Sequence, residues 1–314
     1  MCKLSLGWIR QVKGPFKGMK STANPFAGRS VLALTLSGRR ISVAFPDTVL
    51  EEHSDSLREK TAKLGQIART CSVFGVDTIQ VFRDPRGRGE SALIKRILEY
   101  LETPQYLRRR LFALDESLKF AGLLPPLRIP SHKPKIRLEK LRVGDFREGV
   151  VLADGRMVDI GFEELLSLKQ KTGGNKRVTT RVTSLAPLEG VPADRSQTGE
   201  YWGYTVEVRG ADEILSDSRF GLKIATSRYG APLSSSIGQL REAIHASRGM
   251  MVIFGSPSRG LLEMIRNLRQ RVPFVVNLYP EQYTATVRTE EAMSSGLYLL
   301  ELLDAIKYES LKAD

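Results

Sequence analysis

The order of hydrophobic and polar positions changes twice along the chain. In the first part, short apolar runs alternate with amphipathic stretches. Alternation predicts two strands over 31–46 and one over 78–82, while apolar spacing near 3.6 predicts a helix over 56–71. Two further helices are expected, one after Ser91 and one with Thr103 as its N-cap. This order of strands and helices is typical of a parallel α/β sheet.

The pattern changes at residues 123–135, which contain four prolines and little periodicity. We expect a domain boundary there. Only short strands separated by Gly-rich and polar turns are predicted beyond it, at 149–152, 157–161, 178–184 and 201–209. A run of short strands of this length is typical of a small OB-like β-barrel, and the segment Gly173–Arg177 is expected to be a basic loop on it.

From about residue 214 the alternation of strands and helices returns. The pattern predicts strands at 222–226, 250–254 and 274–277, each followed by a helix, near 237–246, over 261–269 and from Thr289. The last helix places apolar residues on one face, which is expected to pack on the sheet or on a second subunit. We therefore predict one discontinuous α/β domain, residues 1–135 and 213–314, interrupted by an inserted barrel over 136–212.

Charge indicates the kind of partner. The chain of 314 residues has 48 Lys and Arg against 35 Asp and Glu, a net charge of +13. This excess favours a polyanionic partner, and nucleic acid over a membrane, because no basic amphipathic helix is evident. The first 30 residues are expected to form a basic arm.

Several classes of protein are disfavoured. No apolar run is long enough for a membrane span and no secretory signal is present, so a cytoplasmic location is expected. Two cysteines and three scattered histidines argue against a metal site and against a Ser-His-Asp hydrolase. Cys71, on an apolar helix face, is expected to be a small buried hydrophobic residue.

Candidate chemistry lies in the loops after the three C-terminal strands, because ligands of parallel sheets bind beyond the carboxyl ends of the strands. These loops span 226–230, 255–260 and 277–291. The two glycines that bound the second loop would let a ligand approach the backbone, although a plain tight turn explains them equally well. In the third loop, Arg288 could pair with a nearby acid or meet a phosphate or a reacting base. Glu290 could simply complement the dipole of the last helix.

Two segments carry a resemblance to a known family. The sequence GSPSRG (255–260) and the signature N-L-Y-P-E-Q-Y-T-A-T-V-R-T-E-E-A (277–292) resemble the SPOUT class of RNA methyltransferases. The stretch from ISVAFPDTVL to QIARTCSVFGVDTIQVF is similar to its archaeal and eukaryotic branch, in which an OB-like domain interrupts the α/β-knot domain. The resemblance covers most of the chain.

The resemblance implies an S-adenosylmethionine-dependent enzyme that acts as a homodimer on RNA, with a trefoil knot formed by the last three strand–helix units. It leans towards a ribosomal RNA base, such as N3 of a uridine. The implied cofactor-binding residues are Thr226, Ser227, Phe254, Gly255, Asn277, Leu278, Pro280, Thr286 and Val287. Arg288 is the leading catalytic candidate, with Arg259 or Glu290 as its partner.

Candidate RNA contacts combine cations with aromatic rings that could stack on bases. They are Arg177, Arg181, Tyr201, Trp202, Arg108 and Arg109. Trp202 and Tyr204 could instead belong to the barrel core. Two other functions stay open from the residues alone: a non-catalytic RNA-binding or ribosome-assembly protein, and a small-molecule enzyme of flavodoxin-like kind.

Overall fold

A computed structural model describes residues 38–53, 56–113, 115–133, 138–172 and 177–305 of the chain. The expected N-terminal arm and the expected strand before Gly38 lie outside these residues, and so does the basic loop before Arg177.

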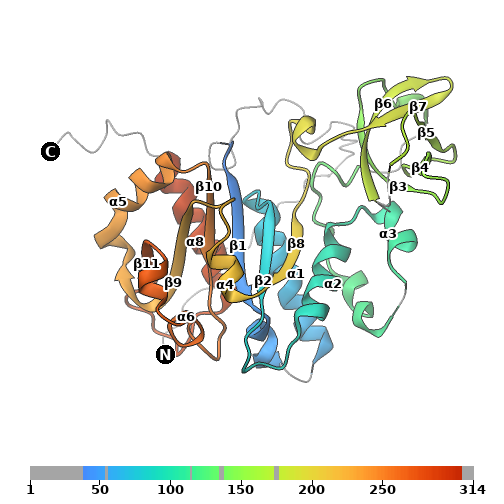
Figure 1. Cartoon of the computed structure of the whole chain (residues 1–314). Coiled ribbons are helices and arrows are strands. Elements are labelled where there is room, and N and C mark those ends of the chain that lie inside the picture. Colours follow the sequence, from blue (N-terminus) through green and yellow to red (C-terminus); the bar gives the residue numbers. More distant parts are fainter. Residues whose placement is uncertain (1–37, 54–55, 114, 134–137, 173–176, 306–314) are drawn as a thin grey trace, which may run out of the picture. The chain divides into compact units, whose positions relative to one another are not determined.

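A six-stranded sheet forms the centre of the α/β part (Figure 1). Its strands, in spatial order, are β11 (Phe274–Asn277), β9 (Leu222–Pro232), β10 (Gly249–Ile253), β1 (Arg40–Pro46), β2 (Thr78–Phe82) and β8 (Thr205–Arg209). Every pair of neighbouring strands is parallel. The parallel α/β sheet predicted from the alternation is therefore confirmed.

The helices connect these strands and cover both faces of the sheet. They are α1 (Leu57–Val73), α2 (Ser91–Glu102), α3 (Gln105–Leu111), α4 (Ala211–Leu215), α5 (Leu233–Ala246), α6 (Leu261–Met264), α7 (Leu268–Arg271) and α8 (Thr289–Ala305). Short 3-10 turns are η2 (Asp47–His53), η3 (Glu116–Leu118), η4 (Ala121–Leu123), η5 (Leu138–Lys140) and η6 (Arg195–Thr198).

Two helix predictions differ from the structure. The single helix expected over 261–269 is two short helices, because Asn267 between them adopts a left-handed backbone with φ of 55°. The N-cap of α3 is Pro104 and the helix begins one residue later than expected. Proline has no backbone N–H to donate, so either position at a helix start suits it.

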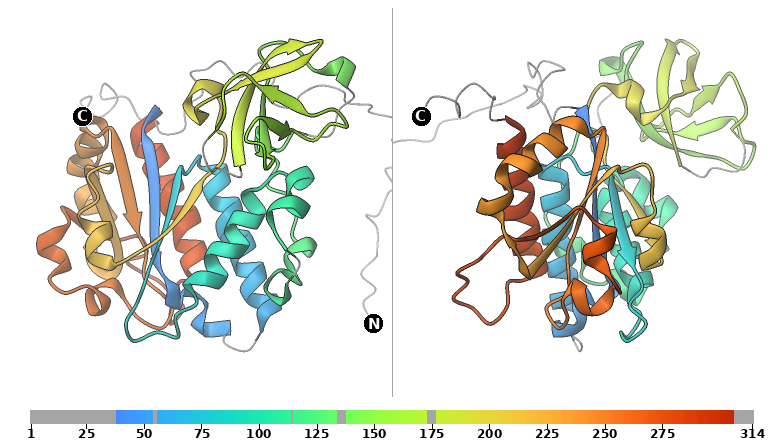
Figure 2. Two further views of the ribbon diagram at one scale, coloured as in Figure 1. Left: turned by 45° about the vertical axis from the view of Figure 1, so that its right-hand side comes forward. Right: turned by 60° about the vertical axis from the view of Figure 1, so that its left-hand side comes forward.

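One face of the sheet carries the main hydrophobic core. Helices α1, α2, α5 and α8 pack their apolar residues on it, as Figures 1 and 2 show. Cys71 of α1 is fully buried there, as its apolar surroundings predicted. The apolar stripe of α8, which includes Leu297, packs in the same core. This helix was expected to pack on the sheet or on a second subunit, and its apolar stripe packs on the sheet of its own chain.

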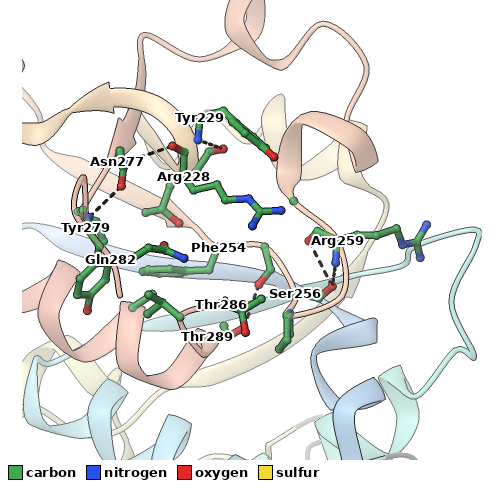
Figure 3. A pocket seen from close by; sticks show the side chains of 18 of the residues that line it. Arg228, Tyr229, Phe254, Ser256, Arg259, Asn277, Tyr279, Gln282, Thr286 and Thr289 are labelled. Carbon is green, nitrogen blue, oxygen red and sulfur yellow. Dashed lines mark hydrogen bonds between the residues drawn. The ribbon is translucent and has the colours of Figure 1, made fainter. Parts of the chain in front are cut away.

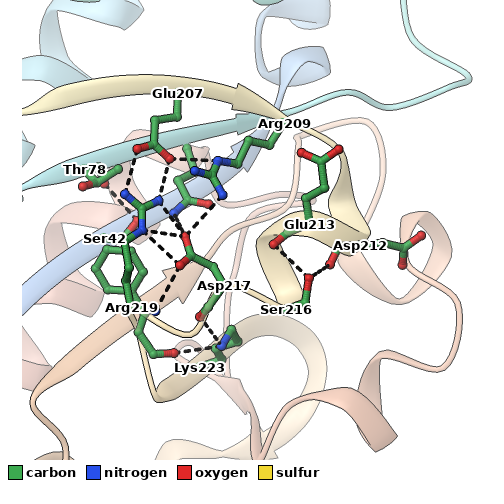
Figure 4. Close-up of polar contacts among 12 residues, drawn as sticks. Ser42, Thr78, Glu207, Arg209, Asp212, Glu213, Ser216, Asp217, Arg219 and Lys223 are labelled. Carbon is green, nitrogen blue, oxygen red and sulfur yellow. Dashed lines mark hydrogen bonds and ion pairs between the residues drawn. The ribbon is translucent and has the colours of Figure 1, made fainter.

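The other face of the sheet is half apolar and half polar. Helices α4, α6 and α7 cover its apolar half, while Arg219 occupies the centre of its polar half (Figure 4). The Arg219 guanidinium donates to both Glu207 and Asp217, at 2.6 Å and 2.7 Å. It thereby holds the pKa of Asp217 far below its usual range. Lys223 is buried, and its ammonium donates to two backbone carbonyl groups.

The strands between α3 and β8 form a closed five-stranded barrel. In spatial order they are β3 (Phe146–Val151), β4 (Met157–Asp159), β5 (Leu166–Leu168), β7 (Leu188–Pro192) and β6 (Arg177–Leu185). The prediction of a small barrel is confirmed. The sequence pattern did not predict β5 and β7, which are three and five residues long.

One predicted barrel strand belongs elsewhere. The expected strand at 201–209 is β8, which pairs with β2 in the parallel sheet, Val206 lying opposite Ile79. Pattern alone could not assign it, because its alternation suits either sheet. Within the described residues, no helix is both long and apolar enough to cross a membrane.

Candidate active site

A cavity opens at the carboxyl edge of the parallel sheet, where a bulge in β9 and the loops after β10 and β11 meet the start of α8 (Figure 3). It is lined by Thr226, Ser227, Arg228, Tyr229, Phe254, Gly255, Ser256, Pro257, Ser258, Arg259, Gly260, Glu263, Asn277, Leu278, Tyr279, Gln282, Ala285, Thr286, Val287, Thr289 and Ala292. All three segments that the sequence singled out contribute, but the expected loop 226–230 is a bulge within β9, because Ala225 pairs with Val275 and Ala231 with Val276. The structure therefore brings together segments that are up to 66 residues apart in the chain, from Thr226 to Ala292.

Most polar side chains of this cavity hold the loops in place. The Asn277 amide donates to the carbonyl oxygen of Arg228 at 2.9 Å and accepts from the Tyr279 N–H at 2.9 Å. The Thr289 hydroxyl donates to the carbonyl oxygen of Gly255 at 3.0 Å, which joins α8 to the loop after β10. With these side chains engaged, much of what remains for a ligand is backbone groups and apolar surface.

Gly255 begins the loop after β10 at a place where a larger residue would not fit freely. A Cβ there would lie 3.2 Å from the carbonyl oxygen of Arg259 and 3.4 Å from the Leu261 nitrogen. The loop therefore folds back closely on itself. Glycine at this position keeps the cavity wall thin and lets a ligand approach the backbone.

Three charged side chains line the cavity, and they differ in their partners. Arg259 turns away from it, its guanidinium 2.5 Å from the buried carboxylate of Asp84 (Figure 3). Arg228 points inward, lies 5.0 Å from the centre of the Tyr229 ring and donates to the carbonyl oxygen of Ala285 at 3.4 Å. Among the described residues, neither Arg228 nor Glu263 forms an ion pair. One unpaired cation and one unpaired carboxylate thus face the cavity.

The expected cofactor-binding residues lie together, with one exception. Thr226, Ser227, Phe254, Gly255, Asn277, Leu278, Thr286 and Val287 all line the cavity. Pro280 does not. Their function as cofactor ligands stays a prediction.

The expected catalytic residues are placed differently. Arg288 is exposed and does not line the cavity; its backbone N–H donates to the Glu291 carboxylate at 2.9 Å. Glu290 is buried beneath the loop, with its carboxylate 3.3 Å from the Lys63 ammonium. Arg259 is the member of the expected trio that lines the cavity, and Asp84 already pairs with it. Their catalytic roles stay predictions.

Among the cavity residues to which sequence reasoning gave no role are Arg228, Tyr229, Glu263 and Tyr279. Arg228 and Tyr229 stand in the segment 226–230, which the pattern had singled out without naming them. Nothing in the pattern of α6 distinguishes Glu263 from an ordinary exposed helix residue. Only the meeting of β10 and α6 at this edge places its carboxylate at the cavity.

Several candidate RNA contacts are engaged inside the protein. Trp202 is 3% exposed and donates to the Glu148 carboxylate at 2.6 Å, so it is a core residue. Tyr201 donates to the carbonyl oxygen of Val76 at 2.9 Å. Arg108 donates to two backbone carbonyl groups of the preceding turn and lies over the Tyr100 ring at 4.5 Å.

Arg177 is engaged as well, between the carboxylates of Glu102 and Glu148 at 2.5 Å each. Arg109 and Arg181, in contrast, are exposed. Tyr204 is buried, but in the core of the parallel sheet and not in the barrel. Within the described ranges no group of three His, Cys, Asp or Glu side chains could hold a metal ion.

Comparison with known proteins identifies the family to which the chain is similar. Residues 40–300 match the family described as "Putative RNA methyltransferase". The chain is 35% identical over 286 residues to an uncharacterised protein of Haloarcula marismortui, which covers 84% of this chain and 99% of that protein. It is 32% identical over 304 residues to the 28S rRNA (uridine-N(3))-methyltransferase of Mus musculus, covering 83% of this chain and 76% of that enzyme.

Among solved structures, the SpoU methyltransferase AviRb from Streptomyces viridochromogenes aligns with 84% of this chain and 60% of its own. The sequence identity is 9% and the TM-score is 0.35. A TM-score of this size establishes no common fold.

Proposed function

The chain belongs to this family of RNA methyltransferases, and we propose that it transfers a methyl group from S-adenosylmethionine to N3 of a uridine in ribosomal RNA. The observation that carries the proposal is the cavity itself. The segments 255–260 and 277–292, which hold the family signature in the sequence, meet there at the carboxyl edge of a parallel sheet. This edge is where α/β folds bind their ligands.

The cavity suits S-adenosylmethionine in shape and chemistry. The close turn at Gly255 and the apolar side chains of Leu278 and Val287 would accept a nucleoside, while backbone groups of the three segments would supply hydrogen bonds. When bound, the cofactor supplies a methyl group on a positively charged sulfur. We propose that the unpaired Glu263 carboxylate faces the positive charge of the bound donor, because nothing in the described chain neutralises it.

Arg228 is our candidate for the charge that develops on the substrate. Loss of the N3 proton of a uracil places negative charge on N3 and on the two neighbouring carbonyl oxygens, and this charge disappears as N3 bonds to the methyl group and the sulfonium becomes a neutral thioether. A guanidinium group inside the cavity, unpaired and held by a fixed backbone, can donate to such oxygens and lower the barrier. Arg228 meets these conditions because the Asn277 amide fixes its carbonyl group, whereas Arg259 already has Asp84 as a partner.

The reaction also needs a proton acceptor for the N3 proton, and the chemistry does not restrict which group this is. The described cavity contains no histidine. The enzyme would therefore act mainly by alignment and by electrostatic stabilisation, since methyl transfer is an in-line displacement that needs no covalent protein intermediate. A uridine has to leave its stack to reach the cavity.

Two finer features of the fold belong to the same proposal. The barrel order β3-β4-β5-β7-β6, with β5 parallel to β7, supports an OB-like domain. Because β8 belongs to the parallel sheet, we place the end of this inserted domain before Thr205. We also propose the trefoil knot that the resemblance implies; within it Gly230 would let the β9 bulge pack directly on β11, since a Cβ there would lie 2.6 Å from the backbone of Val276.

We also propose the homodimer that the resemblance implies. Helices α5 and α8 carry exposed apolar side chains, namely Ile237, Tyr298 and Leu302, at 38%, 57% and 43% exposure. A second copy covering this surface would remove it from water. Sedimentation equilibrium at micromolar concentration tests the homodimer, and a monomer would contradict it.

The cytoplasmic location stays a prediction.

The proposed activity is tested by calorimetry and by mapping. Titration of the full chain with S-adenosylmethionine should show binding, and a Gly255→Leu variant should lose it because the side chain fills the cavity wall. Ribosomal RNA from a deletion strain should lack one methyluridine when it is mapped by mass spectrometry. If the wild-type chain does not bind the cofactor at high micromolar concentration, the alternative of a non-catalytic RNA-binding protein replaces this proposal.

A further inference from the structure

A loop of residues Arg83–Glu90, here named the arginine loop, follows β2 and is held tightly against η2. The Asp84 N–H donates to the Asp47 carboxylate at 3.0 Å, and the Gly87 N–H donates to the Asp84 carbonyl oxygen at 2.9 Å. Gly87 sits so close to η2 that a Cβ on it would lie 2.0 Å from the Thr48 methyl group. The backbone of the loop therefore has little freedom.

The same contacts tie the arginine loop to the cavity. The buried Asp84 carboxylate pairs with the guanidinium of Arg259, in the cavity loop 255–260, at 2.5 Å. A second link runs from that loop to η2, where the Ser258 hydroxyl donates to the Glu51 carboxylate at 2.8 Å. The arginine loop, η2 and the cavity loop thus form one connected set of contacts at the same edge of the sheet.

Three arginines of this loop are exposed, and the charge of one of them, Arg83, acts on the Asp47 carboxylate. Arg86 and Arg88 are exposed, and neither side chain has a hydrogen-bond or ion-pair partner in the described parts of the chain. Neither lines the cavity. This separates them from Arg177 and Arg108, whose guanidinium groups are already bound inside the protein.

We propose that the arginine loop binds the RNA phosphates next to the nucleotide that enters the cavity, with Arg86 and Arg88 as the contacts. This inference rests on the proposed function, because it takes RNA as the substrate. A base turned out of its stack leaves its flanking phosphates at the rim, where cations can hold them. Guanidinium groups suit phosphate because their planar fork donates two parallel hydrogen bonds. A loop already fixed to the cavity wall loses little conformational entropy when it binds RNA.

The test compares two double variants that remove the same charge. Arg86→Gln with Arg88→Gln removes the proposed contacts. Arg40→Gln with Arg248→Gln removes two exposed arginines at the opposite edge of the sheet, where β1 and β10 begin. Both are made in the full chain, and binding to a fluorescein-labelled single-stranded oligouridine is measured by anisotropy over a series of salt concentrations. Because the net charge changes equally, any general electrostatic effect is the same in both.

We expect the Arg86/Arg88 variant to lose about tenfold or more in affinity at low salt. Its slope of log affinity against log salt should fall by about 1.4, because each phosphate of a single strand that an arginine neutralises adds ~0.7 to the slope. The Arg40/Arg248 variant should keep the wild-type slope. Equal losses in the two variants, or an unchanged slope in the first, would overturn the docking proposal.

Calorimetry with S-adenosylmethionine separates this proposal from the function on which it rests. The Arg86/Arg88 variant should bind the cofactor as the wild type does, because neither residue lines the cavity. If the Arg86/Arg88 variant binds the cofactor and its slope of log RNA affinity against log salt is unchanged, only the docking proposal is overturned. A wild type that binds RNA through Arg86 and Arg88 but never binds the cofactor overturns the methyltransferase and leaves the docking surface supported.

Discussion

The guanidinium of Arg177, on barrel strand β6, lies 2.5 Å from the carboxylate of Glu102 at the end of α2. It also lies 2.5 Å from Glu148 on β3, and all three side chains are largely shielded from water. Burial by itself would raise the pKa of Glu148, but Arg177 and Arg195 outweigh burial and lower it. Arg177 is therefore the cation shared by two buried carboxylates where the barrel joins the α/β sheet. Arg195 lies 3.4 Å from Glu102 as a second cation, and burial still raises the pKa of Glu102.

Arg177→Met should destabilise the protein strongly, because it removes the cation that two buried carboxylates share and leaves only the more distant Arg195 near them. Breaking a buried pair in this way costs about 3–5 kcal/mol. The free energy of unfolding, measured in urea, checks this. Glu116→Gln is the matched control, since its pair with Lys119 is 59% and 88% exposed and such pairs contribute less than about 1 kcal/mol. Similar losses in the two variants would show that Arg177 is not the centre of a buried network.

Arg228→Gln should lower the rate of methyl transfer about 100-fold and leave the affinity for S-adenosylmethionine within about twofold, as expected for a group that stabilises the negative charge on the reacting base. Single-turnover kinetics and calorimetry measure the two quantities. If the variant instead loses cofactor affinity and keeps its single-turnover rate, Arg228 binds the carboxylate of the donor and the assignment is wrong.

Glu263→Gln should have the opposite effect. Removing the unpaired carboxylate from the cavity should weaken cofactor binding about tenfold, the loss of one charge-assisted contact of ~1.4 kcal/mol, with less effect on the rate at saturation. Glu242→Gln, on the outer side of α5, serves as the control because it does not line the cavity. Unchanged cofactor affinity in Glu263→Gln would contradict the proposed role.

Asn277→Ala should weaken cofactor binding without touching a charge. The amide of Asn277 joins the bulge of β9 to the loop after β11 through Arg228 and Tyr279, at 2.9 Å each. Without it the two segments lose their common anchor. We expect at least about a tenfold rise in the dissociation constant for S-adenosylmethionine by calorimetry, since two hydrogen bonds of ~1 kcal/mol each disappear. Wild-type affinity in this variant would show that the segments are held by other contacts.

His132 makes the free energy of unfolding depend on pH in the mildly acidic range. Burial lowers the pKa of His132 from 6.5 to about 4. In the unfolded chain it takes up a proton near pH 6.5, but in the folded protein only near pH 4, so the contribution of neutral His132 to stability is present above pH 6.5 and is lost between pH 6.5 and 4. Urea unfolding of wild type and His132→Gln over this range should show a smaller loss in the variant. Parallel curves would contradict the assignment.

Local patterning was enough to identify most of the elements of this protein. Strand β2 follows its predicted bounds, and the apolar stripe of α1 that includes Cys71 is the buried face, because alternation and helical spacing record which side of an element meets the core. The candidate loops after β10 and β11 were also identifiable, since each follows an apolar strand and precedes a helix, whereas the segment 226–230 is a bulge within β9. Their positions in the chain are a local property, and a parallel sheet gathers the carboxyl ends of its strands at one edge.

Tertiary structure decided what no local pattern records, namely which partner each element or charge meets. The alternation of β8 is compatible with a barrel strand, and only its pairing with β2 places it in the parallel sheet. Arg177 and Arg86 look alike as basic residues of a cationic chain, yet one is bound between two carboxylates and the other is exposed, with no side-chain partner among the described residues. The excess of +13 predicted an anionic partner from composition, but only the fold separates the cations that stabilise the protein from those that remain for RNA.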